Sequence, residues 1–423
     1  MPDTRKTAIE ILQNILEKKQ FFKEAKNSVS APENQDSAFL NMLVLTTLRR
    51  LVFIKKTLHK YAKKKLPAKA AYANYALFLG ISELLFMNTP DYAVINSYVN
   101  LTKQQTDKFV AGFVNAVLRK IAADKDEILT EDSGEFFTSE FFKILNTGYG
   151  KKTVAKIQLS AQQEPPLDIT VKQLPEIWAE KLGGTVLTNG SVRLKNNAKI
   201  LELPGYDDGE WWVQDAAASL AVKALGKISG QRVLDLCAAP GGKTAQLIAA
   251  GAKTTALDIS DKRLITLDEN LNRLNFQTER TICTDALEYL KNFDEEPYDI
   301  ILLDAPCSAT GTLRRHPETV HIKSSADIQK MAALQKQLLN LAGKALKNNG
   351  ILLYCTCSIS KIEGENQIAE FLKDNHNFKL LPIKNIGFKE AETPEGYIRT
   401  LPFHLAEQGG MDAFFIAKLQ KEA

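Results

Sequence analysis

Two short segments place a cysteine just after an apolar run of the kind that forms a buried strand. In residues 302–311, "LLDAPCSATG", the run ends at Asp304 and Cys307 follows shortly after. In residues 352–358, "LLYCTCS", Cys357 follows a similar run. A thiolate is a strong nucleophile, and a neighbouring acid can stabilise charge that moves into a substrate. The pattern therefore indicates covalent catalysis, with either thiol as the attacking group.

A zinc site is the alternative explanation for these cysteines. Cys355 and Cys357 form a Cys-x-Cys pair, which has poor spacing beside the usual zinc ligand pairs, and no histidine cluster accompanies it. We therefore expect no metal. Of the remaining thiols, we expect Cys283 and Cys355 to pack in the interior and Cys237 to serve as a small loop residue.

A third segment, residues 234–244 with the sequence "LDLCAAPGGKT", joins a predicted strand to a predicted helix. Its end is similar to a P-loop, but that motif needs a glycine where this chain has Cys237, so the phosphate cradle is incomplete. The small residues let the backbone approach a ligand closely. Asp258 and Asp285 end later strands, where an acid can hydrogen-bond a ribose. Each acid alone is typical of a turn or helix cap, but together they favour a nucleoside cofactor, S-adenosylmethionine or NAD.

Strands and helices alternate from about residue 213, and this alternation predicts how the segments come together. Strands followed by helices are typical of an α/β domain with a parallel, doubly wound sheet. In such sheets the ligand lies beyond the carboxyl ends of the strands, where all the residues above fall. We expect "NNG" at 348–350 to end the long helix that precedes the last strand. The predicted strands are 232–236, 253–259, 298–305 and 351–355.

Two other regions precede this domain. Residues 1–145 have apolar positions three and four apart throughout, as in a helical bundle, with breaks at Pro67 and at "NTPDY". Paired prolines in "QQEPPLDITVKQL" mark a boundary, and "LDITV" and "VRLKN" are typical of short strands. We therefore divide the chain into a helical domain at 1–145, a connecting α+β subdomain at 146–210 and a catalytic domain at 211–423.

The composition is that of an ordinary globular protein with more than one domain: 423 residues, 44% hydrophobic and 25% charged. The N-terminal sequence is typical of an amphipathic helix and not of a signal peptide. No apolar run approaches the roughly 18 residues of a membrane span. Five cysteines, an odd number and all in the second half, favour reduced thiols. We expect a cytoplasmic protein with no membrane contact.

The net charge is only +4, but the basic residues are unevenly distributed. Between Arg49 and Ser82 the chain has nine basic residues and no acid. A solvated helix face explains such a run, and so does a surface that neutralises nucleic-acid phosphates. Both explanations stay open at this point. The nine residues are Arg49, Arg50, Lys55, Lys56, Lys60, Lys63, Lys64, Lys65 and Lys69.

The motifs "LDLCAAPGGKT", "LLDAPCSATGTLRRHPE" and "YCTCSI" resemble, in this order, those of the Sun/Fmu (RsmB) family of RNA cytosine-5 methyltransferases. "LFLGISELLFMNTPDYAVINSYVNL" and "GFVNAVLRKI" resemble the NusB-like domain of the same enzymes. The resemblance implies an all-α NusB-like bundle, a small α+β subdomain and a Rossmann-like (class I) methyltransferase domain. Two positions depart from the family pattern: Ala413 stands where the family usually has glycine, and no tryptophan follows His316 and Pro317.

The resemblance also implies a reaction, the methylation of carbon 5 of cytosine in RNA with S-adenosylmethionine as cofactor. Cys357 is then the nucleophile that bonds to carbon 6, Cys307 assists release of the product, and Asp304 hydrogen-bonds the ring. DNA cytosine methyltransferases attack with a Pro-Cys thiol instead, which would be Cys307 here. The implied cofactor-binding residues are Cys237, Ala238, Ala239, Pro240, Gly241, Gly242, Lys243, Asp258, Asp285 and Asp304.

By the same resemblance the expected partner is RNA, most of all 16S RNA of the small ribosomal subunit, and we expect a monomer. Arg314, Arg315 and His316 are candidates for phosphate contacts. We expect Lys243 to contact the cofactor or the active-site acid, whereas Arg263 matches a family arginine that can equally be a surface charge. Two alternatives stay open: transfer RNA as the substrate, and a non-catalytic RNA-binding assembly factor.

Overall fold

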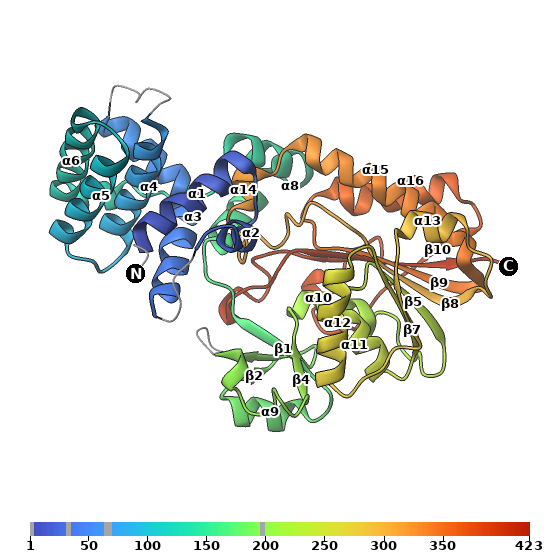
Figure 1. The fold of residues 1–423 in the computed structure, drawn as a ribbon. Helices are drawn as coiled ribbons and strands as arrows, with labels where there is room; N and C mark the ends of the chain where they lie inside the picture. The colour runs from blue at the N-terminus through green and yellow to red at the C-terminus, as the bar shows by residue number, and fades with distance from the viewer. Residues whose placement is uncertain (1–3, 31–34, 63–69, 195–198) are drawn as a thin grey trace. The chain divides into compact units, whose positions relative to one another are not determined.

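The computed structural model describes residues 4–30, 35–62, 70–194 and 199–423, which form two compact units (Figure 1). We call the first the helical unit and the second the α/β unit. The helical unit comprises residues 1–146, 151–162 and 315–324. The α/β unit comprises residues 147–150, 163–314 and 325–423.

The helical unit consists of helices that bury an apolar stripe in a shared core. The first helix, α1 (Thr4–Lys18), places Ala8, Ile11, Leu12 and Ile15 in this core, as their spacing predicts. Among its described residues, the region predicted to be helical therefore contains helices and the loops that join them, and no strand. The other helices are α2 (Phe22–Asn27), α3 (Gln35–Tyr61), α4 (Ala71–Phe86), α5 (Asp91–Gln105), α6 (Lys108–Ala123), α7 (Lys125–Thr130), α8 (Ser139–Ala161) and α14 (Thr319–Ile322).

The basic stretch begins on α3, and acids from later in the chain oppose part of it. Lys56 Nζ lies 3.3 Å from Glu135, and Lys60 Nζ lies 2.7 Å from Glu131. Arg49 is buried. The helix therefore carries less unbalanced positive charge than its own sequence indicates. Four residues of the stretch lie outside the described residues: Lys63, Lys64, Lys65 and Lys69.

By length and composition, α3 is apolar enough over Ser37–Tyr61 to cross a membrane, which the sequence analysis did not expect. Half of this apolar window is buried inside the structure. The core helix of a soluble protein passes the same test, so α3 is only weak evidence for a membrane segment.

A segment from the second half of the chain, residues 315–324, belongs to the helical unit. Nε2 of His321 lies 2.8 Å from the carbonyl oxygen of Leu48, which is 273 residues away along the chain. The N–H group of Phe22 donates to the buried Glu318 at 3.0 Å, across 296 residues. Contacts over such sequence distances leave no local pattern, so no sequence motif marks the segment as part of this unit.

The α/β unit begins with a small antiparallel sheet in the strand order β2–β3–β1–β4. Its central strand, β1 (Leu167–Val171), is the predicted "LDITV" strand. It pairs with β3 (Val192–Leu194), from the predicted "VRLKN" strand, and with β4 (Trp211–Val213). The remaining elements are β2 (Thr185–Val186) and α9 (Pro175–Leu182).

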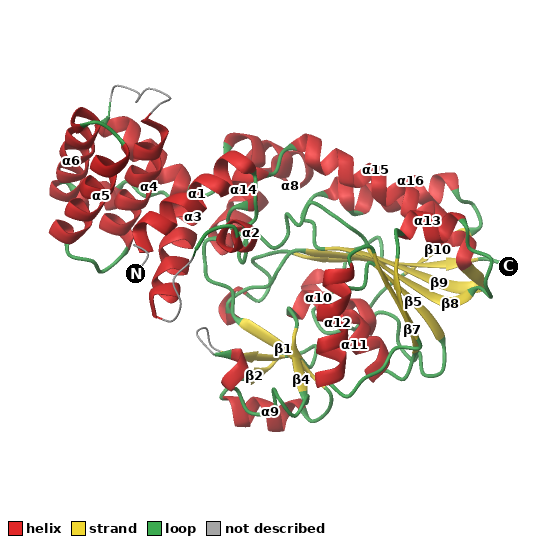
Figure 2. Ribbon diagram, viewed as in Figure 1, coloured by secondary structure: helices red, strands yellow, loops and turns green. Residues whose placement is uncertain are grey.

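A larger mixed sheet forms the rest of this unit, in the order β10–β12–β9–β8–β5–β6–β7 with β11 paired to β12. β5 to β9 run parallel, as predicted, and β10, β11 and β12 add antiparallel pairs that we did not predict. Helices α13, α15 and α16 cover one face, and α10, α11 and α12 cover the other (Figure 2). The strands are β5 (Arg232–Leu236), β6 (Lys253–Asp258), β7 (Arg280–Cys283), β8 (Tyr298–Asp304), β9 (Leu346–Thr356), β10 (Phe378–Leu381), β11 (Ile398–Thr400) and β12 (Phe414–Lys421). The helices are α10 (Ala216–Lys223), α11 (Gly242–Ala249), α12 (Asp261–Arg273), α13 (Ala286–Lys291), α15 (Ser325–Ala342) and α16 (Glu365–Asp374).

The prediction that "NNG" ends the long helix is wrong. Helix α15 ends at Ala342, and "NNG" lies inside β9. Tyr298 pairs with Leu346 whereas Ile300 already pairs with Ile351, so the residues between form a bulge in β9. The turn-forming residues "NNG" do lie at an irregular part of the backbone, the bulge. The strand nevertheless continues on both sides of the bulge, because β9 pairs with β8 before and after it.

Candidate active site

The predicted site residues of the α/β unit meet at the carboxyl edge of the parallel strands. Asp258 ends β6 and Asp304 ends β8, and β5 lies between these two strands. Cys355 of β9 is the register partner of Asp304. Side chains that are far apart in the sequence therefore come together where an open α/β sheet binds its ligand.

The loop after β5 depends on two residues with a left-handed backbone. Cys237 has φ 62° and Gly241 has φ 101°. A Cβ atom on Gly241 would also lie 3.0 Å from Cγ of Leu267, so this position needs glycine for its conformation and for its space. The N–H group of Ala238 donates to the carbonyl oxygen of Leu257 at 3.0 Å, which ties the loop to β6.

Asp258 is almost fully buried, and its carboxylate organises this loop. Oδ2 accepts from the N–H group of Ala239 at 3.2 Å, and Oδ1 accepts from that of Ser260 at 3.0 Å. Arg263 reaches back from α12, with Nη1 3.2 Å from Asp258 and Nη2 donating to the Ala239 carbonyl oxygen. Arg263 therefore clamps the loop to the acid, although 52% of its side chain is exposed.

A cavity of about 230 Å³ opens beside the loop, bordered by Asp258, Asp285 and apolar side chains such as Ile259 and Leu287. Asp285 also caps α13, because its Oδ1 accepts from the N–H groups of Leu287 at 2.7 Å and of Glu288 at 3.1 Å. A carboxylate at a strand end next to apolar walls fits the ribose and base of a nucleoside. The residues present therefore fit the adenosine part of S-adenosylmethionine.

Lys243 and Asp304 form an ion pair at the centre of the site, with Nζ 2.7 Å from Oδ2. Burial lowers the pKa of Lys243, but the charge of Asp304 and the hydrogen bond to it, together with the charges of nearby thiolates, outweigh burial, so this pKa lies above its ordinary value. The thiolate forms of Cys355 and Cys357 act in the same direction. Of the two partners considered for Lys243, the structure shows the active-site acid. The lysine thus holds a positive charge next to the thiols.

The sulfur atoms of Cys307 and Cys357 lie 3.4 Å apart. The two turns that carry them are joined by the main chain, because the N–H group of Gly311 donates to the Cys357 carbonyl oxygen at 2.9 Å. The hydrogen bond with Cys357, together with burial, raises the pKa of Cys307 well above its ordinary value. The thiols of two separate motifs therefore form one hydrogen-bonded pair.

The burial of the other three cysteines agrees only in part with the prediction. Cys355 is buried as expected, with its sulfur 3.4 Å from Oδ1 of Asp304. Cys283 is exposed, so the expectation that it packs in the interior is wrong. Burial, followed by the charge of Asp304, raises the pKa of Cys237 to about 12. In the described part of the chain, no three His, Cys, Asp or Glu side chains are grouped to hold a metal ion.

Sequence reasoning missed the buried acid Asp235 of β5. Its Oδ2 accepts from Oγ1 of Thr244 at 2.6 Å. Burial raises the pKa of Asp235 to about 7; the Thr244 hydrogen bond lowers it, and the charge of Asp304 raises it again. Sequence reasoning also missed Glu363, a buried acid that accepts hydrogen bonds from Ser308 and Ser358. The only sequence signal for Glu363 is an acid shortly after the second cysteine motif, in a segment with the pattern of an exposed turn.

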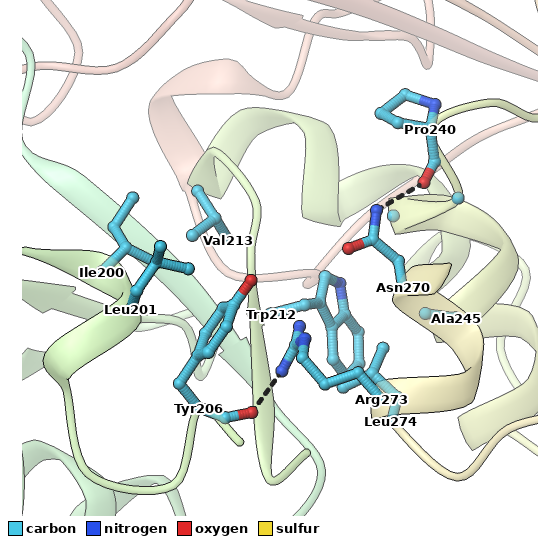
Figure 3. A pocket seen from close by; sticks show the side chains of 12 residues that line it. Ile200, Leu201, Tyr206, Trp212, Val213, Pro240, Ala245, Asn270, Arg273 and Leu274 are labelled. Atoms are coloured by element: carbon cyan, nitrogen blue, oxygen red, sulfur yellow. Dashed lines mark hydrogen bonds between the residues drawn. The ribbon is translucent and has the colours of Figure 1, made fainter. Parts of the chain in front are cut away.

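A second cavity, of about 380 Å³, also borders the glycine loop (Figure 3). Its wall includes Trp212 and two side chains of α12 that reach main-chain oxygens. Asn270 Nδ2 donates to Pro240 at 3.1 Å, and Arg273 Nη1 donates to Tyr206 at 2.6 Å. Among the residues that the structure describes, no cysteine or acid lines this cavity, so it shares the loop with the predicted site but none of its reactive groups.

The three basic residues after the Cys307 motif do not form one surface. Arg314 is fully buried and donates to the carbonyl oxygen of Gly409, so the expected phosphate contact from Arg314 is wrong. Arg315 and His316 belong to the helical unit and are partly exposed. His316 packs edge-on against Phe21 at 5.7 Å between ring centroids. Phosphate contacts from these two residues stay a prediction.

Comparison with known proteins agrees with this geometry. Residues 222–420 match the model of the 16S rRNA methyltransferase RsmB/F family, and residues 2–123 match that of the NusB family. Ribosomal RNA small subunit methyltransferase B of Pasteurella multocida is 32% identical over 440 residues, covering 99% of this chain and 96% of the relative. The protein of the same name from Escherichia fergusonii is 32% identical over 407 residues, covering 92% and 91%.

Solved structures show the same fold. The crystal structure of PH0851 matches with a TM-score of 0.78 at 24% identity, covering 100% of this chain and 99% of that one. NSun6 from Pyrococcus horikoshii, determined with SFG, matches with a TM-score of 0.59 at 20% identity, covering 68% and 99%. Full-length relatedness, both family models and the site geometry agree: the chain belongs to the ribosomal RNA small subunit methyltransferase B family of S-adenosylmethionine-dependent methyltransferases.

Proposed function

We propose that this chain methylates carbon 5 of cytosine in RNA, most of all in 16S RNA of the small ribosomal subunit. The observation that carries this proposal is the thiol pair with sulfur atoms 3.4 Å apart, beside an acid held by Lys243. A protein that only binds RNA has no use for such a pair. The relatives named ribosomal RNA small subunit methyltransferase B support the choice of RNA. When bound, S-adenosylmethionine supplies a methyl group on a positively charged sulfur.

Carbon 5 of cytosine is too weak a nucleophile to take a methyl group directly. The thiolate of Cys357 forms a bond to carbon 6, and the electron pair of the 5,6 double bond moves onto carbon 5. Carbon 5 then takes the methyl group. A base removes the carbon 5 proton, and the electron pair of that C–H bond restores the double bond. The bond between carbon 6 and sulfur breaks, which returns the thiolate of Cys357.

Asp304 and Lys243 hold the ring while its charge changes. In this proposal Asp304 accepts a hydrogen bond from the exocyclic amine of cytosine, and from N3 once N3 takes up a proton as charge moves into the ring. Lys243 fixes the orientation of that carboxylate, with Nζ 2.7 Å from Oδ2. Preorganised polar groups in a water-poor site stabilise developing charge without reorganising during the reaction.

The two thiols take different roles. We assign the attack to Cys357 and product release to Cys307, as the family resemblance implies. The raised pKa of Cys307 supports this division, because a thiol that keeps its proton can donate a hydrogen bond to the leaving sulfur.

The target cytosine must be unpaired or flipped out of a helix before a thiol can reach its face. Single-stranded or partly assembled ribosomal RNA meets this need. We propose that the helical domain at 1–145 binds RNA, that 146–210 connects it, and that 211–423 performs the chemistry. Binding through basic residues predicts a steep dependence of affinity on salt.

The test compares the wild-type chain with Cys307→Ala and Cys357→Ala. Each protein is mixed with S-adenosylmethionine and unmodified small-subunit RNA, then followed by a methyl-transfer assay and a denaturing gel. We expect Cys307→Ala to accumulate a slow-migrating protein–RNA adduct and Cys357→Ala to give neither adduct nor methylation. If Cys307→Ala abolishes both and Cys357→Ala methylates normally, the roles are reversed.

Two other outcomes would replace the proposal. Bisulfite mapping of RNA from a deletion strain that shows the lost methyl groups in transfer RNA would change the substrate. Full complementation of the deletion phenotype by Cys357→Ala would favour a non-catalytic assembly factor.

A further inference from the structure

Glu363 is a fully buried acid that the reaction above does not use. It ends the short 3-10 turn Lys361–Glu363, between the second cysteine motif and α16. No ion pair of Glu363 exists among the described residues, so hydrogen bonds alone stabilise its carboxylate. A buried carboxylate without a cation is costly, and such groups persist where several donors satisfy them.

The donors to Glu363 come from both cysteine motifs. Ser308, the residue after Cys307, donates its N–H group to Oε1 at 2.8 Å and its hydroxyl to Oε2. Ser358, the residue after Cys357, donates its hydroxyl to Oε2 at 2.6 Å. One carboxylate therefore ties together the residues that directly follow the two thiols.

Two further side chains complete this network. Gln335 of α15 donates from Nε2 to Oε1 of Glu363 at 3.0 Å and to the carbonyl oxygen of Pro306 at 2.8 Å. The hydroxyl of Thr310 lies 2.9 Å from that of Ser308 and 3.0 Å from that of Ser358. The network leaves neither cysteine turn free to move without breaking a hydrogen bond to a buried charge.

We propose that Glu363 is a positioning residue for the thiol pair, which sets the separation of Cys307 and Cys357. The inference rests on the proposed function for the roles of the two thiols, but its geometry does not depend on the substrate.

Electrostatics acts in the same direction as the geometry. The pKa of Cys307 is raised by its hydrogen bond with Cys357, then by burial, and then by the charges of Cys357 and Glu363. The negative charges of Glu363 and of a Cys357 thiolate both disfavour ionisation of Cys307. The other titratable groups around the pair are Asp304, Lys243, Tyr354 and Cys355.

The test distinguishes the effect of the negative charge of Glu363 from the effect of the length of its side chain. Glu363→Gln keeps the shape and removes the charge, whereas Glu363→Asp keeps the charge and shortens the side chain. Asp168→Asn is the matched control, because Asp168 is also a buried acid of the α/β unit and pairs with Arg193 at 2.7 Å, within a different sheet.

Two measurements are made on each full-length variant. The first is the rate of alkylation of Cys307 and of Cys357 by iodoacetamide as a function of pH, resolved by mass spectrometry, with neither RNA nor cofactor present. The second is kcat and KM for methyl transfer to small-subunit RNA. The first measurement reports the thiols themselves, which a merely structural role would not shift.

For Glu363→Gln we expect the pH midpoint of Cys307 alkylation to fall by about one unit, because a nearby negative charge is gone. We expect kcat to fall about 100-fold with KM for RNA within about twofold, as misplaced reacting groups produce. For Glu363→Asp we expect an unchanged midpoint and a roughly 10-fold lower kcat. Asp168→Asn should lose stability and keep both the midpoint and kcat.

The proposal is overturned if Glu363→Gln keeps the wild-type midpoint and kcat, or if Asp168→Asn shifts them equally. If Glu363→Gln does not fold, Glu363→Asp decides, and a wild-type kcat would then overturn the proposal. A wild-type chain that methylates no RNA cytosine overturns the proposed function instead. In that case the alkylation midpoints still decide whether Glu363 controls the thiols.

Discussion

Two ion pairs, one from each unit of this chain, differ in how far their charges are exposed to water. In the helical unit, Lys56 of α3 pairs with Glu135, with 61% and 40% of the side chains exposed. In the α/β unit, Lys243 and Asp304 pair with only 11% and 31% exposed. Both are Lys–carboxylate pairs of ordinary length, so distance does not distinguish them. Burial does, because a charge that has lost its water depends on its protein partner.

The buried ionisable groups extend this contrast to the effect of pH. In the helical unit His321 is half-buried, and desolvation of its ring lowers the pKa of His321 to about 4. The α/β unit buries Asp235, and burial raises the pKa of Asp235 to about 7. Each group resists charging, but one is a base and the other an acid. The contributions of these two groups to stability should therefore change with pH in opposite directions.

The largest expected effect comes from breaking the buried pair. Asp304→Asn should lower the rate of methyl transfer about 10³-fold, because Lys243 loses its counter-charge and the substrate ring loses a preorganised partner. The measurement is kcat with S-adenosylmethionine and small-subunit RNA. Asp299→Asn is the control, since Asp299 lies near the other end of β8 and pairs with Lys347 at 2.9 Å. A rate for Asp304→Asn within tenfold of wild type would contradict the contrast.

The next effect is the pH dependence of the α/β unit. Asp235 keeps its proton up to about pH 7 when folded and loses it near pH 3.8 when unfolded. Its contribution to the free energy of unfolding is therefore full below pH 3.8 and is lost as the pH rises to 7. The wild type loses this contribution as the pH rises, and Asp235→Asn has no such contribution to lose. The free energy of unfolding of Asp235→Asn, taken relative to that of the wild type, should therefore increase by about 3 kcal/mol from pH 4.5 to pH 7.5. Tryptophan fluorescence can follow this unit, because all three tryptophans lie in it. A pH-independent difference would show that Asp235 titrates normally.

A smaller effect of opposite sign is expected in the helical unit. Unfolded His321 binds a proton below pH 6.5, whereas the folded residue resists protonation down to about pH 4. The stability contribution is therefore present above pH 6.5 and lost as the pH falls to 4. The free energy of unfolding of His321→Gln, taken relative to that of the wild type, should therefore increase by about 2 kcal/mol as the pH falls from 7.5 to 4.5. Hydrogen exchange of peptides from α3 provides the measurement. If the relative stability of His321→Gln increased with rising pH instead, Asp235 and His321 would not act in opposite directions.

The smallest effect belongs to the exposed pair. Glu135→Gln removes the partner of Lys56 and should change the free energy of unfolding by roughly 0.5 kcal/mol, because water and salt replace the lost interaction. Denaturant unfolding at low and high salt is the measurement. A loss as large as that expected from the buried groups would show that exposure does not separate the two kinds of pair.

The sequence predicted the parallel strands well because their apolar runs and turns are local features. The strand 232–236 was predicted with its observed bounds, and Asp258 and Asp304 were placed correctly at strand ends. "NNG" was misread because strand pairing across a bulge is not local. Cys283 and Arg314 were misread because exposure depends on what packs against a residue from elsewhere in the chain.

By itself, the sequence determined the chemical inventory: a small-residue loop, two cysteine motifs, the strand-end acids Asp258 and Asp304, and a resemblance that named a family. Only the tertiary structure decided how these groups interact. It set the two sulfur atoms 3.4 Å apart, paired Lys243 with Asp304 and placed Glu363 between the cysteine turns. The physical reason is that residue type and spacing encode local conformation and reactivity, whereas burial and charge pairing arise from contacts between distant segments.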